Sequence, residues 1–141
     1  MDLKELQQLW EKDSVIDDVL IDQSSIKIPQ LHAKYMAYHN HYSLLMKRAI
    51  TELKTAEHKK WLYYSGKADP EEYTEKPFKH KVPKSDIPRW LSADEDLNNI
   101  ETKVEYYNCL VNTLNEILRQ IHQMSYNIKN VIEWRKFSSG V

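Results

Sequence analysis

The chain of 141 residues has only two glycines, a single cysteine and no long apolar run. Gly66 and Gly140 lie far apart, so neither a dinucleotide-binding motif nor a P-loop can be written, and all-β folds also need more glycine. The lone Cys109 cannot form a disulfide within the chain. The longest apolar or aromatic run is 61–64, whereas a membrane span needs about 20 residues. With acidic Asp2 near its start, the chain is also not expected to carry a secretory signal.

Net charge is also scarce: 20 Lys and Arg stand against 21 Asp and Glu, a formal charge of −1. Taken alone, this balance argues against a nucleic-acid partner. The charges are unevenly distributed, however, at −5 over residues 1–25, +6 over 26–91 and −2 over 92–141. A basic middle can meet a polyanion, and an acidic start can meet a basic protein or shield the basic patch. The alternative is that mixed charges only keep long helices solvated.

A long helix is predicted over 93–137. It begins after a capping box, in which Ser92 accepts from the Glu95 amide and the Glu95 side chain reaches back. Ten of eleven positions at heptad spacing are apolar or aromatic: Leu97, Ile100, Val104, Tyr107, Val111, Leu114, Leu118, Ile121, Ser125, Ile128 and Ile132. The stripe is widened on one flank by Leu110, Ile117, Met124 and Val131.

A second long helix is predicted from Pro29 to Tyr64, with the proline in its first turn and Gly66 ending it. Its packed face is expected to carry Leu31, Tyr35, Tyr38, Tyr42, Leu45, Ala49, Leu53 and Ala56. A short amphipathic helix over 3–10 opens the chain. Because a helix over 93–137 is about 65 Å long, the sequence predicts an elongated all-α hairpin or bundle in a single domain, 1–141. The wide apolar stripe further predicts a homo-oligomer.

The connection 66–91 contains four of the five prolines, so it is predicted to be irregular and either functional or mobile. Its second half, 76–90, carries five bases and one acid with aromatic residues between them. Binding of single-stranded nucleic acid needs such cations for phosphates and aromatic faces for stacking. The stretch 54–64 offers the same combination. The competing interpretation is that Trp61, Tyr63, Tyr64 and Trp90 belong to the core.

Neither catalysis nor a metal or cofactor is expected. The six histidines are scattered, and no nucleophile–base pair can be singled out. His39 and His41 are two positions apart, and on a helix such side chains point about 200° away from each other, so they cannot chelate one ion. The acids Asp94, Glu95 and Asp96 are explained by helix capping, and Cys109 by its place beside an apolar stripe.

Several short strings resemble the UvsY family, the recombination mediator proteins of T-even-like tailed phages. They are Tyr-Tyr-Ser-Gly-Lys at 63–67, Leu-Ser-Ala-Asp-Glu-Asp at 91–96, Ile-Lys-Asn-Val-Ile at 128–132, and Arg135-Lys136-Phe137 leading to Gly140. The opening, with Leu3, Leu6, Asp13 and Ile16-Asp17, also fits. The resemblance covers nearly the whole chain, patchily over 18–55 and best from Tyr63 onward.

The resemblance implies a non-enzymatic protein without a cofactor, located in the host-cell cytoplasm. It implies a ring-like homo-oligomer, a hexamer or heptamer, that binds single-stranded DNA and contacts the phage recombinase and the phage single-stranded DNA-binding protein. Such a protein helps to load the recombinase in recombination, repair and recombination-dependent replication. Two basic residues of the family's DNA-contacting motif fall here on His58 and Lys60, with Lys59 between them; His58 carries charge only when protonated.

The predicted DNA patch consists of Lys54, His58, Lys59 and Lys60, supported by Lys47 and Arg48, with secondary candidates Lys67, Lys76, Lys79, Lys81, Lys84 and Arg89. The predicted subunit contact is the carboxyl-terminal part of the long stripe: Ile121, Met124, Ile128, Val131, Ile132 and Phe137. The competing hypothesis is a non-enzymatic helical scaffold or coiled-coil adaptor with no nucleic-acid role. Salt-dependent binding of oligo-dT discriminates between the two.

Overall fold

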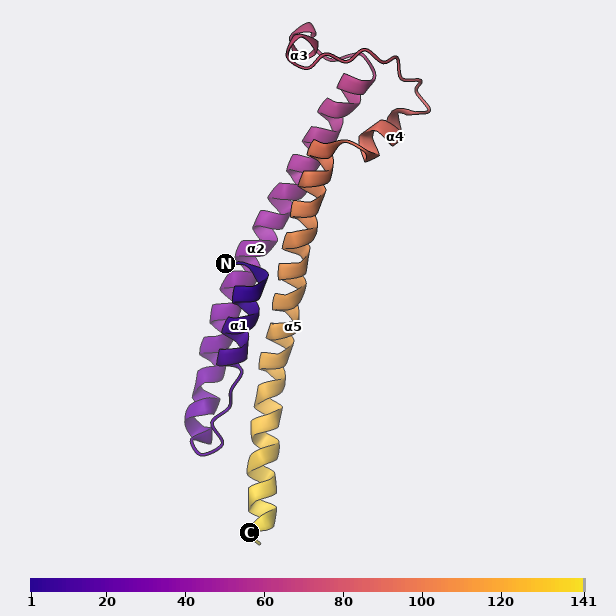
Figure 1. Ribbon diagram of the computed structural model, residues 1–141. Coiled ribbons are helices and arrows are strands. Elements are labelled where there is room, and N and C mark those ends of the chain that lie inside the picture. Colours follow the sequence, from indigo (N-terminus) through magenta and orange to yellow (C-terminus); the bar gives the residue numbers. More distant parts are fainter. Residues whose placement is uncertain (141) are drawn as a thin grey trace. The chain divides into compact units, whose positions relative to one another are not determined.

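The protein is built from helices (Figure 1). Its computed structural model describes residues 1–140, and within them no strand is present. The elements are α1 (Leu3–Asp13), α2 (Ile21–Tyr64), α3 (Pro70–Glu75), α4 (Ile87–Ser92) and α5 (Glu95–Ser138). The predicted all-α class is therefore confirmed. None of these helices combines the length and apolar character needed to cross a membrane.

The chain divides into two compact units, and α2 and α5 each contribute to both. The first unit contains Met1–Ser43 together with the chain from Asn108 onward, and the second contains Leu44–Tyr107. The first unit therefore holds α1 with the amino-terminal half of α2 and the carboxyl-terminal half of α5. The second holds the other halves of α2 and α5 together with α3 and α4.

In the first unit, α1 packs beside α2 and closes over its aromatic residues. The Asp2 carboxylate caps α1 by accepting from the Glu5 amide, and the Glu5 side chain accepts from the Asp2 amide in return. The Asp13 carboxylate at the other end of α1 accepts from Lys34 Nζ at 2.6 Å and from the buried Tyr35 hydroxyl at 2.8 Å. The Asp13 contacts fix the carboxyl-terminal end of α1 against α2, and near the other end the Tyr42 hydroxyl donates to the Met1 carbonyl at 3.2 Å.

The buried face of α5 changes along its length. Leu97 is buried in the second unit, as the heptad pattern predicts. In the first unit the buried side chains are Leu110, Val111, Leu114, Ile117, Ile121, Met124 and Ile128, whereas Leu118 is half-buried and Ser125 is exposed. Ile117 and Met124, on the flank of the stripe, are therefore buried in place of Leu118 and Ser125, which the heptad spacing had placed on the packed face. The reason is that α1 and α2 both belong to this unit, so α5 has a broader surface to cover than a two-helix seam provides.

Helix α2 begins eight residues before the predicted start, so Pro29 lies inside it instead of in its first turn. The turn before the helix is held by Asp17, whose carboxylate accepts from the Val19 and Leu20 amides. The buried Ser24 hydroxyl also donates to the Asp17 carbonyl and accepts from the Asp17 amide. These side-chain bonds support a helix start that a proline signal alone does not indicate.

Helix α5 begins at Glu95, within two residues of the prediction, but its cap differs. Asp94 caps the helix, because its Oδ1 accepts from the Leu97 amide at 3.0 Å. Ser92 is instead the last residue of α4, and its hydroxyl donates to the Arg89 carbonyl. The connection 66–91, for which irregular structure was predicted, contains α3 and most of α4. The predicted capping box at Ser92 was therefore wrong, because α4 occupies that segment.

Candidate nucleic-acid interface

The second half of α2 presents a row of cations on its outer face. Lys47, Lys54 and His58 are spaced at seven and four residues, so they lie along one side of the helix, and all three are exposed. Arg48 and Lys59 are exposed on an adjacent side. Within residues 1–140, none of the Lys and Arg side chains of this row has an ion-pair partner. The row can therefore meet phosphates without first breaking an internal pair.

Lys60 lies on the packed face of α2. It continues the three- and four-residue spacing of Leu53 and Ala56, so its side chain points toward the start of α5. Its Nζ lies 2.8 Å from Asp96 Oδ2 and 3.3 Å from Asp94 Oδ2. Burial alone would lower the pKa of the Lys60 ammonium, but the Asp96 and Asp94 carboxylates raise it above its ordinary value. Lys60 is thus held as a cation by two carboxylates.

The Asp94 carboxylate joins this cluster to the helix cap. It is buried, and its Oδ2 also accepts from the Tyr64 hydroxyl at 2.5 Å. Burial would raise the pKa of Asp94, but the Tyr64 and Leu97 hydrogen bonds and the Lys60 charge together lower it. Burial and the same hydrogen bond raise the pKa of the Tyr64 phenol. A partly buried, charged hydrogen-bond network therefore holds the end of α2 against the start of α5.

The aromatic residues of the two predicted DNA-binding stretches pack on one another. Tyr63 stacks on Tyr73 with ring centroids 5.4 Å apart, and Phe78 contacts the rings of Tyr63, Tyr64 and Trp90. The Tyr63 hydroxyl also donates to the Lys76 carbonyl. These side chains form a small aromatic core that fastens the connection to the end of α2. Tyr63, Tyr64 and Trp90 are half-buried in it.

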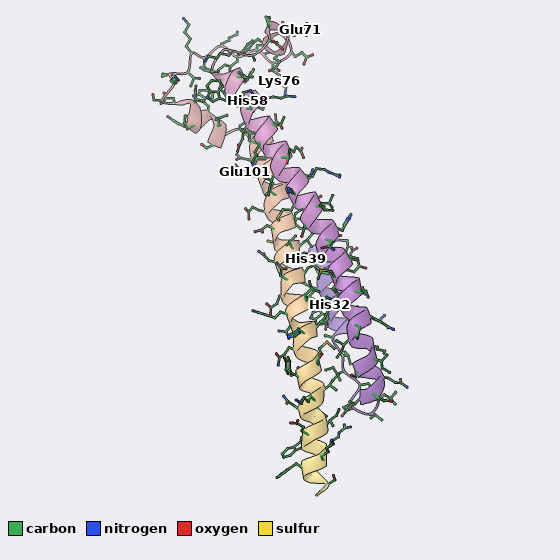
Figure 2. All side chains as sticks on the ribbon, turned by 180° about the vertical axis from the view of Figure 1, so that it is seen from behind. His32, His39, His58, Glu71, Lys76 and Glu101 are labelled. Atoms are coloured by element: carbon green, nitrogen blue, oxygen red, sulfur yellow. The ribbon has the colours of Figure 1, made fainter. Side chains whose placement is uncertain are left out.

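The secondary basic candidates have different surroundings. Lys67 lies over the Trp61 ring, 4.9 Å from its centroid, and Lys76 Nζ lies 4.0 Å from Asp96 Oδ2. Figure 2 labels Lys76 and His58 at the end of α2 against which the connection packs. The remaining candidates are exposed: Lys79, Lys81, Lys84 and Arg89.

Two of the hollows formed by the described residues of this unit differ in charge. One, of about 270 Å³, is lined by three lysines (Lys59, Lys60, Lys76), three carboxylates (Glu72, Glu75, Asp96) and Tyr63. The other, of about 470 Å³, is lined by His80, Lys81, Val82, Pro83, Asp86, Arg89, Trp90 and Ala93. In the first hollow the charges cancel. In the second, two cations face a single carboxylate, so it is the more favourable site for a phosphate.

The predicted subunit-contact residues separate into two groups. Ile121, Met124 and Ile128 are buried in the core of the first unit. Val131, Ile132 and Phe137 are exposed, at 38%, 39% and 77%. Trp134, which the heptad positions did not include, is 67% exposed and stacks on Phe137. An apolar surface therefore lies at the carboxyl-terminal end of α5, from Val131 to Phe137.

Sequence reasoning did not identify the carboxylate partners of Lys60 or the contributions of Tyr73 and Phe78 to the aromatic core. The signal for Lys60 was present, because it continues the spacing of the packed face. No comparable signal exists for the ring contacts, which join residues far apart in the chain.

The chain is similar to known proteins over almost its entire length. Residues 9–141 match the family described as recombination, repair and ssDNA binding protein UvsY. The recombination protein uvsY of Enterobacteria phage T4 is 27% identical over 140 residues, which cover 99% of each chain. A crystal structure of the bacteriophage T4 recombination mediator protein UvsY matches with a TM-score of 0.88 and 26% identity, covering 99% of this chain and 98% of that one. A second lattice form of the T4 protein matches with a TM-score of 0.85 and 26% identity, covering 95% and 98%.

Proposed function

Since the chain belongs to the UvsY family of recombination, repair and ssDNA-binding proteins, we propose that it is a recombination mediator that binds single-stranded DNA through the second half of α2. The observation that carries this proposal is the row of exposed cations formed by Lys47, Lys54 and His58. Arg48 and Lys59, which are also exposed, support the row from the adjacent side. The proposed role is one of binding, without a catalytic step of its own.

Within the proposed site, Lys59 and Lys60 have separate roles. Lys59 contacts phosphate, because its side chain is exposed and has no ion-pair partner within residues 1–140. Lys60 positions the end of α2 against α5 through Asp94 and Asp96. It therefore contributes to DNA binding mainly by keeping its neighbours in place. The cations of the connection, Lys67, Lys76, Lys79, Lys81, Lys84 and Arg89, provide secondary contacts.

The proposed activity requires several copies of the chain. One subunit presents only a few free cations, whereas an oligomer presents the same row repeatedly along one strand, which multiplies the apparent affinity. We infer a ring-like homo-oligomer, a hexamer or heptamer, assembled through the exposed apolar surface from Val131 to Phe137. The solved relatives are themselves named recombination mediator proteins.

As a mediator, the oligomer would help a phage recombinase to assemble on single-stranded DNA covered by the phage single-stranded DNA-binding protein. This step serves recombination, repair and recombination-dependent replication in the host-cell cytoplasm. The acidic segment 1–25, with a net charge of −5, is proposed to contact a protein partner or to shield the basic row when DNA is absent.

Fluorescence polarisation with labelled oligo-dT over a salt series tests the DNA-binding part. A steep loss of affinity with rising salt is expected, because each phosphate contact releases counterions. Replacing Lys54 and Lys59 by glutamine should reduce both the affinity and the salt slope. Exchanging Lys129, an exposed lysine in the other unit, for glutamine is the matched control. Absence of binding at low salt would contradict the proposal and favour the helical scaffold.

The mediator part needs a second assay. DNA-dependent ATP hydrolysis by the phage recombinase is measured on single-stranded DNA saturated with the single-stranded DNA-binding protein. Addition of the protein should shorten the lag before hydrolysis, and the Lys54 and Lys59 double variant should restore the lag. DNA binding without any effect on this lag would leave a DNA-binding protein that is not a mediator.

A further inference from the structure

The larger hollow in the second unit has properties that the proposed phosphate contacts do not use. Its volume of about 470 Å³ lies within the range of about 300–1,000 Å³ that is usual for small-molecule sites. It lies between residues 80–83 of the connection and α4 with the residues on either side of that helix. Three of its lining side chains, Val82, Pro83 and Ala93, are apolar. The hollow can therefore accommodate a group larger than a phosphate.

Two aromatic rings line the hollow. The His80 and Trp90 rings lie 5.3 Å apart at an angle of 39°. Phe78 contacts the Trp90 ring from another direction at 5.4 Å and 88°, and Tyr64 contacts it at 5.8 Å. The indole is consequently held in place by the aromatic core while still lining the hollow. A ring that is already fixed loses little conformational freedom when a base stacks on it.

Charged side chains line the same hollow. Lys81 and Arg89 are exposed cations, and Asp86 is the single carboxylate among the lining residues. Within residues 1–140, neither cation is ion-paired with Asp86 or with another acid. The Asp86 carbonyl accepts from the Arg89 and Trp90 amides, which fixes the backbone of this wall. The two unpaired cations suit the phosphate of a nucleotide, and the two aromatic rings suit its base.

We propose that this hollow is a one-nucleotide subsite for single-stranded DNA, in which a base stacks against Trp90 and His80 and the adjoining phosphate contacts Lys81 and Arg89. The inference rests on the proposed function, since it takes the same ligand. It adds a contact with a base to the phosphate contacts along α2. Stacking accepts every base, so the subsite suits a protein that binds single strands irrespective of sequence.

Oligo-dT and an abasic strand of the same length and charge separate stacking from phosphate binding. Both are labelled and titrated by fluorescence polarisation at one salt concentration. The wild-type protein should prefer oligo-dT by about 5-fold or more, the ratio that corresponds to one stacked base. Trp90→Leu should abolish this preference while retaining affinity for the abasic strand.

Two further variants keep the test valid if Trp90→Leu disturbs folding, since Trp90 also packs in the aromatic core. His80→Ala removes an exposed ring and should also reduce the preference for oligo-dT. Arg89→Gln should weaken binding of both strands and lower the salt slope by about 0.7, the value for one phosphate contact on a single strand. Lys129→Gln is the matched control: Lys129 is an exposed lysine of the other unit that does not line the hollow. It should leave the preference for oligo-dT unchanged.

The outcomes distinguish this inference from the proposed function. If the wild-type protein binds both strands equally, or if folded Trp90→Leu and His80→Ala keep the preference for oligo-dT, the subsite is refuted. Salt-dependent binding would then still support the phosphate contacts on α2. If the wild-type protein binds neither strand at low salt, both the proposed function and the subsite fail.

Discussion

Replacing Lys60 by methionine separates a role in folding from a role in DNA contact. Methionine retains a long apolar stem, so packing within the second unit is largely preserved while the ammonium is removed. Asp96 then loses its nearest cation. Asp94 loses one of its partners but keeps the Tyr64 hydroxyl and the Leu97 amide.

The expected loss of stability follows from the exposure of the two carboxylates. The Asp96 side chain is 58% exposed, so solvent screens its ion pair with Lys60 and that pair contributes little to stability. The Asp94 side chain is 4% exposed, and a lost hydrogen bond to a buried charge costs about 1.5–3 kcal/mol. Because two other hydrogen bonds to Asp94 remain, we expect Lys60→Met to lower the free energy of unfolding by about 2 kcal/mol.

Denaturant unfolding followed by circular dichroism measures this change. The protein concentration is held constant, since subunit association alters the apparent stability. Lys59→Met is the matched control: its side chain is exposed, so its free energy of unfolding should change by less than about 0.5 kcal/mol. In oligo-dT titrations the order should reverse, with Lys59→Met weakening binding more than Lys60→Met. A positioning role for Lys60 is refuted if Lys60→Met leaves the free energy of unfolding unchanged and weakens DNA binding at least as much as Lys59→Met.

Four further predictions concern stability and assembly. Tyr64→Phe removes one donor to the buried Asp94 carboxylate, so its free energy of unfolding should fall by about 1.5–3 kcal/mol; no change would show that this hydrogen bond contributes nothing. Folding lowers the pKa of Asp94 below its ordinary 3.8, so its contribution is complete above that pH and is lost as the pH falls through the lower, folded-state value. As the pH falls below about 4, the free energy of unfolding should therefore decrease less steeply in Asp94→Asn than in the wild type. Equal slopes for the two proteins would contradict this prediction. Gly66 has a φ of +77°, and a Cβ at this position would meet only open space, so Gly66→Ala should cost about 1 kcal/mol from backbone strain alone, as measured by thermal unfolding. Exchanging Trp134 and Phe137 for serine should reduce the subunit number in light scattering without loss of helix content, and an unchanged number would place the subunit contact elsewhere.

The helices are the part of the fold that local sequence predicts well. Apolar residues at three- and four-residue spacing predicted α5 to within two residues at each end, because helical periodicity is a property of neighbouring positions. The start of α2 was not predicted, since Pro29 suggested a first turn. A proline inside a helix costs about 3 kcal/mol or more, and the packing of the surrounding helix has to offset that cost. Such packing involves residues distant in the chain, which local signals do not report.

In the candidate site, too, some features are visible in the local sequence and others depend on contacts between distant residues. The concentration of positive charge over residues 26–91, at +6, is visible in the sequence, as are the aromatic residues beside it. The sequence does not distinguish Lys59 from Lys60, which are adjacent and chemically identical. Their roles differ because neighbouring helical residues point about 100° apart, so Lys60 faces the start of α5 while Lys59 faces solvent.

By itself, then, the sequence determined an all-α protein with long amphipathic helices and a basic middle segment, because periodicity and charge are read along the chain. Only the tertiary structure decided which cations are free for phosphates and which aromatic rings are covered by one another. Lys60 is paired with carboxylates 34 and 36 positions further along the chain, and Tyr64 contacts Trp90 across the whole connection. Those contacts depend on where the start of α5 and the connection pack against α2, and that placement is set by burial of apolar and aromatic surface between distant segments.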